Sequence, residues 1–416
     1  MALQSDPSRI NSAGDDGWMT AEQVAEVLSL KRATVYAYVS RGLLQRTVAL
    51  DGRTSLFERS EVEALRTGRN SGSAGELRTI LSTSITKIAE GSVLIRGRNL
   101  VDEVSRGAGF SDIADLIWEA DNKGIWSNLF AASEAPDWPL GDIDLSPLDR
   151  LRVAVALASS RDPFRLDLSP PVVRRTGPRL IKAMIDCFAF RGEPNPNPTD
   201  AFGMVVAVAL WPRLSPSKPT TLQLRCLDVT LALMADHGLA ASTFAARVAA
   251  STRADPYAVV GAGLGAIGGP LHGAASAGVH RALRSIEVGG ELEVAPGAAT
   301  ALGPMAGFGH TIYRNVDPRY GLLLELVTEA WSDDPRLDAL EEYRRLVAER
   351  TEAAPNVDLG LGLLTYLAGM KSDAGEVIFA ISRTAGWIGH AMEEYEERPL
   401  RLRPKGHYVG PLHIAP

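Results

Sequence analysis

Three histidines stand in stretches of small residues, where a ligand could reach the imidazole ring. His237 is followed by a glycine, His272 lies in a nearly uncharged Gly/Ala run, and His310 has a glycine directly before it. Glycine carries no side chain, so the backbone can approach a bound molecule closely. Imidazole changes charge near neutral pH and can donate or accept a proton. The three are therefore candidate functional groups, although each alone also fits a buried structural histidine with satisfied hydrogen bonds.

Acidic and basic side chains add further chemistry. Asp358 lies between two apolar stretches, where burial would raise the pKa of its carboxyl towards that of a general base. Arg314 and Arg319 follow His310 closely, and a guanidinium offers paired N–H groups to a phosphate or a carboxylate. No two histidines lie three or four residues apart on one helix face, so the sequence predicts no metal site.

The chain from about residue 76 onward must position these groups, and its hydrophobic pattern is mainly helical. Small β-elements are expected at 83–85 and 92–95. The expected helices cover 99–106, 111–122, 146–159, 177–190, 199–212, 221–235, 240–252, 255–266, 270–286, 318–332, 335–351, 357–369 and 374–396. This pattern predicts an all-α body, with clusters of Pro and Gly separating its helices.

A smaller module precedes this body. Thr20 and Gln23 have the spacing of a capping box, and Asp51-Gly52 is a strong hairpin signal. The expected helices cover 21–28, 33–40 and 60–67, and the hairpin joins 45–50 to 53–57. Residues 18–67 thereby resemble the winged helix-turn-helix of the MerR and excisionase type. Residues 1–17 are expected to be disordered, and residues 68–75 to form a flexible linker.

Composition restricts the setting and the partners. The 416 residues have a net charge of −7, and residues 1–75 contain nine basic and nine acidic side chains. Because counterion release drives nucleic-acid binding, this balance leaves DNA an unproven partner. Cys187 and Cys226 provide no disulfide framework, so a cytoplasmic protein is expected. The apolar run 257–279 is rich in Gly and Ala and contains Pro270, so no membrane partner is expected.

Several motifs, taken in order, resemble citrate synthase. They are LSTSITKIAEGSVLIRGRNL from Leu81, then ADHGLAASTFAARVAAST, GGPLHGA, GFGHTIYRNVDPRY, PNVD, RTAGWIGH and RPKGHYVG, which ends at Gly410. The resemblance implies a mainly helical citrate synthase fold over residues 76–416. It also implies an obligate homodimer whose active site is shared between subunits. A small mobile domain, approximately 273–382, would close against a large domain formed by the remainder.

By position, the resemblance assigns catalysis to three residues. Asp358 would remove a methyl proton from acetyl-CoA, His272 would hydrogen-bond the thioester carbonyl, and His310 would polarise the ketone of oxaloacetate. That methyl proton is very weakly acidic, so the base and the oxygen-stabilising donor must act together. The oxaloacetate ligands would be His237, Arg319, Arg383 and Arg403 of the partner subunit. The residues facing CoA would be Arg314, Ala306, Gly307 and Gly309, with Ser242 supporting the site from behind.

The implied reaction condenses acetyl-CoA with oxaloacetate and water to give citrate and CoA, a step of the tricarboxylic acid cycle. It needs no cofactor, because acetyl-CoA is a substrate. A 2-methylcitrate synthase using propionyl-CoA stays open, since one methylene changes binding by only ~1–3 kcal/mol. A DNA-binding regulator with a citrate-synthase-like sensor body also stays open. Polar groups usual in the family are replaced at Gly238, Ala240, Ser276, Ala277 and Thr311, which predicts weakened or redirected activity.

Overall fold

The computed structural model describes residues 17–40, 44, 46–48, 54–66, 81–89, 91–131, 144–194, 203–269, 275–290, 305–310, 312–313 and 315–404. The chain divides into two compact units, Met1–Ser82 and Thr83–Pro416, whose hydrophobic cores are separate clusters. The stretch predicted to be disordered (apart from Gly17) and the predicted linker lie outside the described residues. Among the described helices, none has the length and hydrophobicity to cross a membrane.

The first unit packs three helices against a small antiparallel sheet. Its elements are β1 (Trp18–Thr20), α1 (Ala21–Val27), α2 (Arg32–Ser40), β2 (Thr47–Val48), β3 (Ser55–Glu58) and α3 (Arg59–Arg66). Strand β3 lies between β1 and β2. The Thr20 hydroxyl accepts from the Gln23 N–H, and the Gln23 side chain accepts from the Thr20 N–H. The predicted helices, the capping box and the hairpin pairing are confirmed, whereas Asp51-Gly52 lies outside the described residues.

The second unit begins with a three-stranded antiparallel sheet. Its strands, in sheet order, are β4 (Thr86–Ala89), β5 (Ser92–Ile95) and β6 (Arg98–Asn99). Strand β5 was predicted, but the strand expected at 83–85 is wrong by three residues. The Ser84 N–H donates to the Glu393 carboxylate at 2.7 Å, and the Ile85 N–H donates to the Thr83 hydroxyl at 3.2 Å. Side chains thus hold these two amides, and the ladder starts later.

The rest of the second unit is helical, which confirms the predicted all-α body. Its helices are α4 (Leu100–Ser105), α5 (Phe110–Trp118), α6 (Lys123–Ala131), α7 (Pro147–Arg161), α8 (Pro170–Asp186), α9 (Val205–Leu214), α10 (Thr221–Met234), α11 (Ala241–Ser251), α12 (Pro256–Ile267), α13 (Ala275–Glu287), α14 (Pro318–Ala330), the 3₁₀ helix η3 (Pro335–Leu337), α15 (Asp338–Ala348), α16 (Val357–Leu367) and α17 (Ala374–Glu396).

Some helix predictions need correction. Helix α6 was not predicted, and α8 begins at Pro170, seven residues before its predicted start. Prolines are tolerated in a first helical turn because the missing N–H has no partner there anyway. Gly177 and Pro178 lie inside the helix, where Gly177 packs so closely against the Trp118 ring that a Cβ would collide with it. Helix α5 ends at Trp118 because Glu119 adopts a left-handed conformation, φ 51°.

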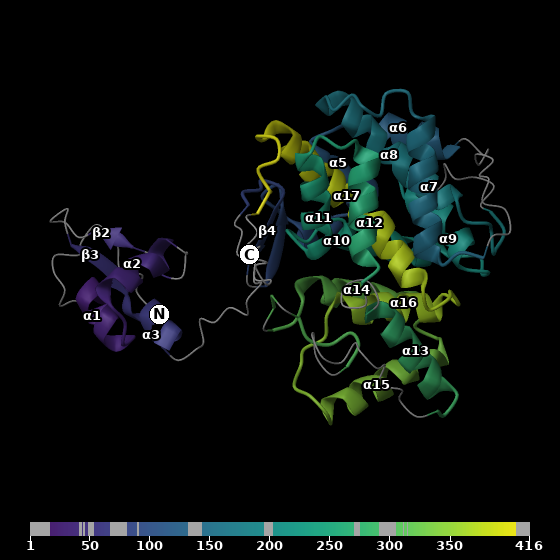
Figure 1. Ribbon diagram of the computed structural model, residues 1–416. Coiled ribbons are helices and arrows are strands. Elements are labelled where there is room, and N and C mark those ends of the chain that lie inside the picture. Colours follow the sequence, from purple (N-terminus) through teal and green to yellow (C-terminus); the bar gives the residue numbers. More distant parts are fainter. Residues whose placement is uncertain are drawn as a thin grey trace, which may run out of the picture. The chain divides into compact units, whose positions relative to one another are not determined.

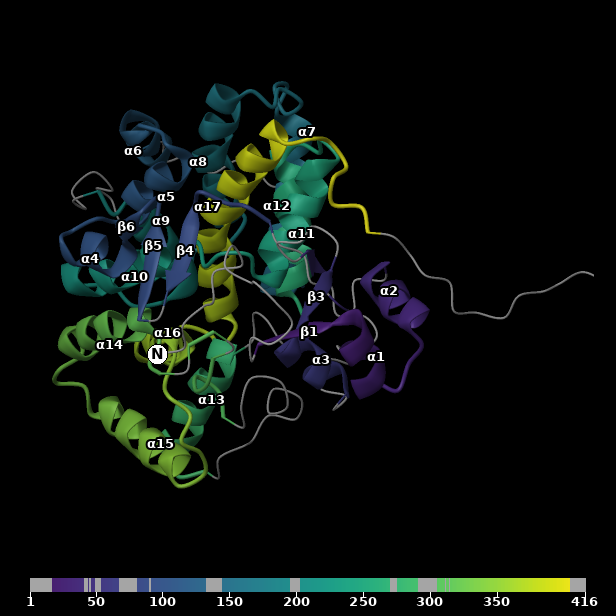
Figure 2. The ribbon, with the colours of Figure 1, turned by 90° about the vertical axis from the view of Figure 1, so that its left-hand side faces the viewer.

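Helix α17 runs through the interior of the second unit. It contacts α5, α8, α10, α11 and α12, which are arranged along it in Figures 1 and 2. Most of its residues from Ala374 to Ala391 are buried. The Trp118 indole N–H donates to the Ala385 carbonyl at 2.8 Å. Gly386 allows the Asp236 carboxylate to lie directly against the helix, since a Cβ there would collide with it.

The segment 305–310 is tied to the start of α16. The Gly309 N–H donates to the Ala354 carbonyl at 2.8 Å, and the Asn356 N–H donates to the Gly307 carbonyl at 2.9 Å. Both glycines have positive φ, 78° and 83°, which glycine adopts without strain. The Asn356 side chain donates to the Gly309 carbonyl at 2.7 Å and accepts from the Asp358 N–H at 2.9 Å. One asparagine therefore places this segment beside the first turn of α16.

Candidate active site

One pocket of about 680 Å³ gathers most of the predicted site residues that the structure describes. It lies where the turn after α10, the 305–313 segment and the starts of α14 and α16 meet the middle of α17. Its polar lining residues are His237, His310, Arg319, Asn356, Asp358 and Arg383. Its apolar lining residues are Ile88, Met234, Leu239, Ala240, Ala241, Ala266, Ile312, Val357 and Phe379. A few convergent polar groups among apolar walls are typical of small-molecule sites.

His310 has its tautomer set by the backbone. Its Nδ1 accepts hydrogen bonds from the N–H groups of Ile312 at 3.0 Å and Tyr313 at 3.2 Å. Burial, followed by the nearby Arg319 charge, lowers the pKa of His310. The ring is therefore neutral at pH 7, with its proton on Nε2. A neutral imidazole with Nε2–H is a hydrogen-bond donor suited to a carbonyl oxygen.

His237 lies against this histidine. The two ring centroids are 5.4 Å apart in an edge-on arrangement, and His237 Nε2 lies 2.8 Å from the Tyr313 hydroxyl. Burial is the main cause that holds the pKa of His237 well below its ordinary value, and the positive charge of Arg319 adds to it. Tyr313 is itself buried and contacts both imidazoles. Sequence reasoning assigned no role to this tyrosine.

Arg319 enters the pocket from the first turn of α14. Its Nε and Nη2 pair with the two carboxylate oxygens of Asp317 at 3.0 and 2.7 Å. Asp317 also accepts from the N–H groups of Arg319 and of Val357, which begins α16. The guanidinium is buried and locked in one orientation, and its neutralised charge lowers the cost of that burial. The Asp-Pro-Arg sequence is the signal from which this arrangement could have been predicted.

Arg383 faces the pocket from α17. Its Nε donates to the Met234 carbonyl at 2.9 Å, and its guanidinium lies over the Phe379 ring, 4.6 Å from the centroid. Burial lowers the pKa of Arg383 to about 10, so the group stays charged at neutral pH. Among the described residues no carboxylate pairs with its terminal nitrogens. A buried, charged guanidinium without a carboxylate directly paired to its terminal nitrogens is suited to an anionic ligand.

Asp358 lies in the first turn of α16 and is half-buried. Burial raises the pKa of its carboxyl to about 6, while the Arg319 charge acts in the opposite direction. The predicted shift towards the range of a useful base is confirmed. At neutral pH the carboxylate form predominates, yet its basicity exceeds that of an ordinary aspartate.

Several predicted site residues lie elsewhere. Gly309 lines the pocket, whereas Ala306 and Gly307 do not, because a buried Gly307 packs against Val279 and Leu359. Ser242 is fully buried in α11 outside the pocket lining. Arg403 is exposed after the end of α17 and does not line the pocket of its own chain. His272 and Arg314 lie outside the described residues.

Four of the five positions at which this chain lacks a polar group usual in the family lie in the described residues. Gly238 has φ 63°, a conformation that disfavours other residues, and its Cα faces Ile88. Ala240 precedes α11 without a side-chain cap. The Ser276 hydroxyl is buried and has no hydrogen-bond partner in the part of the chain that the structure describes, and Ala277 is buried beside it. Thr311 lies outside the described residues.

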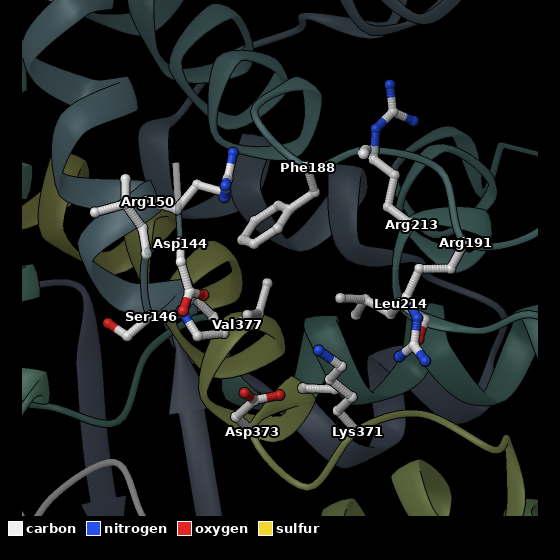
Figure 3. A pocket seen from close by; sticks show the side chains of 14 residues that line it. Asp144, Ser146, Arg150, Phe188, Arg191, Arg213, Leu214, Lys371, Asp373 and Val377 are labelled. Carbon is white, nitrogen blue, oxygen red and sulfur yellow. The ribbon is translucent and has the colours of Figure 1, made fainter. Parts of the chain in front are cut away.

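A second pocket of about 450 Å³ contains none of the predicted site residues (Figure 3). Arg150, Arg191 and Lys371 line it together with Asp144 and Asp373. Figure 3 shows the Arg213 guanidinium directed away from these carboxylates, and Arg213 pairs with Asp186 at 2.9 Å. Its mixed charges give no comparable set of functional groups. Among the described residues no group of three or more His, Cys, Asp or Glu side chains could hold a metal ion.

Fold and site together define an enzyme: a helical body whose buried pocket combines a carboxyl with a pKa of about 6, neutral imidazoles and an arginine whose terminal nitrogens have no carboxylate paired to them among the described residues. The chain belongs to the citrate synthase family, whose model "Citrate synthase, C-terminal domain" matches residues 77–405. A "Helix-turn-helix domain" model matches residues 18–70. Both predicted resemblances, and the mainly helical fold, are thereby confirmed.

The similar proteins include both activities considered for this chain. Citrate synthase of Haloferax volcanii is 30% identical over 339 residues, covering 74% of this chain and 88% of that protein. 2-Methylcitrate synthase of Mycobacterium tuberculosis is 28% identical over 353 residues, covering 79% and 88%. Citrate synthase of Pyrobaculum aerophilum has a similar structure, with a TM-score of 0.65, 25% identity and coverage of 81% of this chain and 92% of that chain. The Thermoplasma acidophilum enzyme, solved with carboxymethyl coenzyme A and oxaloacetate, has a TM-score of 0.63, 23% identity and coverage of 81% and 95%.

Proposed function

We propose that this protein condenses acetyl-CoA with oxaloacetate and water to give citrate and CoA. The observation that carries the proposal is the convergence of Asp358, His310, Arg319 and Arg383 on one pocket. Arginines suit a dicarboxylate, and a neutral Nε2–H suits a ketone. The proposal is supported by the citrate synthase relatives, which span most of the chain.

In this reaction Asp358 takes the methyl proton of the acyl-CoA, since its raised pKa makes it a stronger base than an ordinary aspartate. The enol attacks the ketone carbon of oxaloacetate, and His310 Nε2–H donates to the developing alkoxide. Arg319, Arg383 and His237 hold the oxaloacetate. Hydrolysis of the thioester then releases CoA.

The remaining roles belong to the same proposal and depend on the sequence. His272 stabilises the enol oxygen, and Arg314, Ala306, Gly307 and Gly309 contact CoA. Ser242 supports the site from behind. The domain boundaries stay those expected from the sequence, with a small domain at approximately 273–382 that closes over the substrates.

The assembly and the location are part of the proposal as well. A homodimer places Arg403 of the partner subunit at the oxaloacetate, which fits the exposure of Arg403 and its absence from the pocket of its own chain. Cys187 and Cys226 are buried free thiols, and burial raises the pKa of each to about 12. Unreactive thiols suit a reducing cytoplasm.

The test is release of CoA thiol from purified protein given oxaloacetate with acetyl-CoA or propionyl-CoA, each over a range of concentrations. Faster release from acetyl-CoA supports citrate synthase, and faster release from propionyl-CoA supports the 2-methylcitrate alternative. Ile88, Leu239 and Ile312 give the pocket apolar walls, and neither acyl group differs from the other in charge or hydrogen-bonding groups. Absence of thiol release with both substrates would refute both activities.

A second candidate function, DNA binding, is favoured by the helix-turn-helix unit. Exposed Lys31 and Arg32 stand at the start of α2, although Arg32 pairs with Glu22 at 2.8 Å. A regulator would bind a specific DNA sequence and change its affinity with oxaloacetate or acyl-CoA. Deleting residues 1–70 should then remove DNA binding and leave thiol release unchanged. Equal DNA affinity after the deletion would contradict this role.

A further inference from the structure

Three polar residues on one face of α17 lead from the pocket to the C-terminal end of this helix. Arg383, His390 and Glu394 are spaced seven and four residues apart, a spacing that returns to the same side of a helix. Arg383 lines the pocket, whereas His390 and Glu394 have no exposed surface. Glu394 lies about 16 Å along the helix from Arg383.

The middle residue of this row, His390, contacts Asp236 in the turn 236–238. Its carboxylate accepts from the Gly238 N–H at 3.0 Å, from the Thr86 hydroxyl at 2.5 Å and from His390 Nε2 at 3.4 Å. His390 Nδ1 lies 3.2 Å from Arg247 Nη1, which can only donate. The proton of His390 therefore lies on Nε2, facing Asp236.

Glu394 forms the far end of the row. Its carboxylate accepts from Arg247 Nε at 3.0 Å and from Arg401 Nε and Nη2 at 2.9 and 2.8 Å. Arg247 is fully buried, and its pairing with Glu393 and Glu394 offsets the cost of burying its charge. The backbone beside Arg401 is held as well, because the Leu400 N–H donates to the Ser251 carbonyl at 2.8 Å.

We propose that Glu394 is a positioning residue for the segment 400–404, which carries Arg403. The inference rests on the proposed function, in which the Arg403 of each subunit reaches the other subunit's oxaloacetate. The two hydrogen bonds that Arg401 donates to Glu394 hold the chain at residue 401 and leave Arg403 exposed two residues further on. A segment ordered before binding loses less conformational freedom when its arginine contacts the substrate.

Two variants and one matched control test the inference. Glu394→Gln keeps the side-chain shape and removes the charge. Arg401→Gln removes the ion pair with Glu394 by changing its partly exposed partner. Glu394 stays paired with the buried Arg247, so folding is preserved. Glu397→Gln removes an equal charge from a residue whose side chain is 45% exposed and 3.7 Å from Arg401.

The first measurement is hydrogen exchange of the Leu400 amide, which requires no activity. We expect at least tenfold faster exchange in Glu394→Gln and Arg401→Gln, and wild-type exchange in Glu397→Gln. Wild-type exchange in all three would overturn the inference. Calorimetry with oxaloacetate should show three- to tenfold weaker binding in the first two variants only, and unchanged binding there would also overturn it. If the wild type binds no oxaloacetate, the proposed function fails while the exchange result still decides the positioning role.

Hybrid dimers show in which subunit Glu394 acts. Subunits with Asp358→Ala lack the base but keep an intact segment 400–404, and they are mixed with Glu394→Gln subunits. In the hybrid, the working pocket of the Glu394→Gln subunit receives Arg403 of the partner subunit from an intact segment. We expect the KM for oxaloacetate to return to the wild-type value there. A KM that stays raised would place the effect inside the variant's own pocket and overturn the proposal.

Discussion

At the scale of single residues, Asp358 meets two conflicting demands. Proton abstraction at neutral pH needs the charged carboxylate, yet burial favours its neutral form and raises the pKa to about 6. The nearby guanidinium of Arg319 offsets part of this cost. The charged Asp358 side chain therefore stabilises the folded protein less than a neutral side chain of the same shape would.

Replacing Asp358 by Asn should separate stability from activity. Thiol release should fall by about 10²–10⁴-fold, as expected for a general base. The folded-state pKa is above the ordinary 3.8, so the stabilisation that this group provides is present below pH 4 and is lost as pH rises through 6. At pH 7 Asp358→Asn should therefore raise the free energy of unfolding by about 1–3 kcal/mol. Urea unfolding at pH 4 and 7 measures this, and a less stable variant at pH 7 would contradict it.

Tyr313 offers a test with a matched control. Tyr313→Phe removes the hydroxyl that hydrogen-bonds His237, which should raise the KM for oxaloacetate several-fold and cost about 1 kcal/mol of stability. Tyr320→Phe removes a buried hydroxyl that has no hydrogen-bond partner among the described residues, so it should cost nothing. Steady-state kinetics and thermal unfolding compare the two. Equal effects of both substitutions would show that the Tyr313 hydrogen bond has no special role.

At the scale of elements, the start of α16 places the base. Asn356→Ala removes the side-chain cap of this helix and the bond to the Gly309 carbonyl. We expect a loss of about 0.5–2 kcal/mol, together with reduced kcat/KM. Asp255→Ala removes the equivalent cap of α12, away from the pocket lining, and should cost similar stability without changing kcat/KM. If Asp255→Ala lowers kcat/KM as much, the cap of α16 does not act through Asp358.

Local signals in the sequence predicted most of these elements, since caps and periodicity act over a few residues. The start of α8 was misplaced because Gly177 fits a long-range contact with Trp118 that no local pattern reveals. Strand β4 was misplaced for the same kind of reason, through Glu393. In the site, motifs predicted His310 and Asp358, but they did not predict that Tyr313 hydrogen-bonds His237. That contact depends on two segments 76 residues apart.

At the scale of the whole molecule, the two hydrophobic cores are separate. A chain lacking residues 1–75 should therefore fold, keep the thermal midpoint of the second unit and release thiol at the full-length rate. Scanning calorimetry of both chains, with kinetics in parallel, checks this. A lower midpoint or a slower rate in the shortened chain would show that the first unit supports the catalytic body.

The hydrogen bonds to His310 Nδ1 have a consequence for how this protein can evolve. Their donors are main-chain N–H groups of residues 312 and 313, so no side chain there has to be retained to keep the proton on Nε2. Only a proline at either position would remove a donor. The exposed Ile312 side chain, which lines the pocket, is therefore free to diverge and to adapt the pocket to new acyl groups while the donor stays in place.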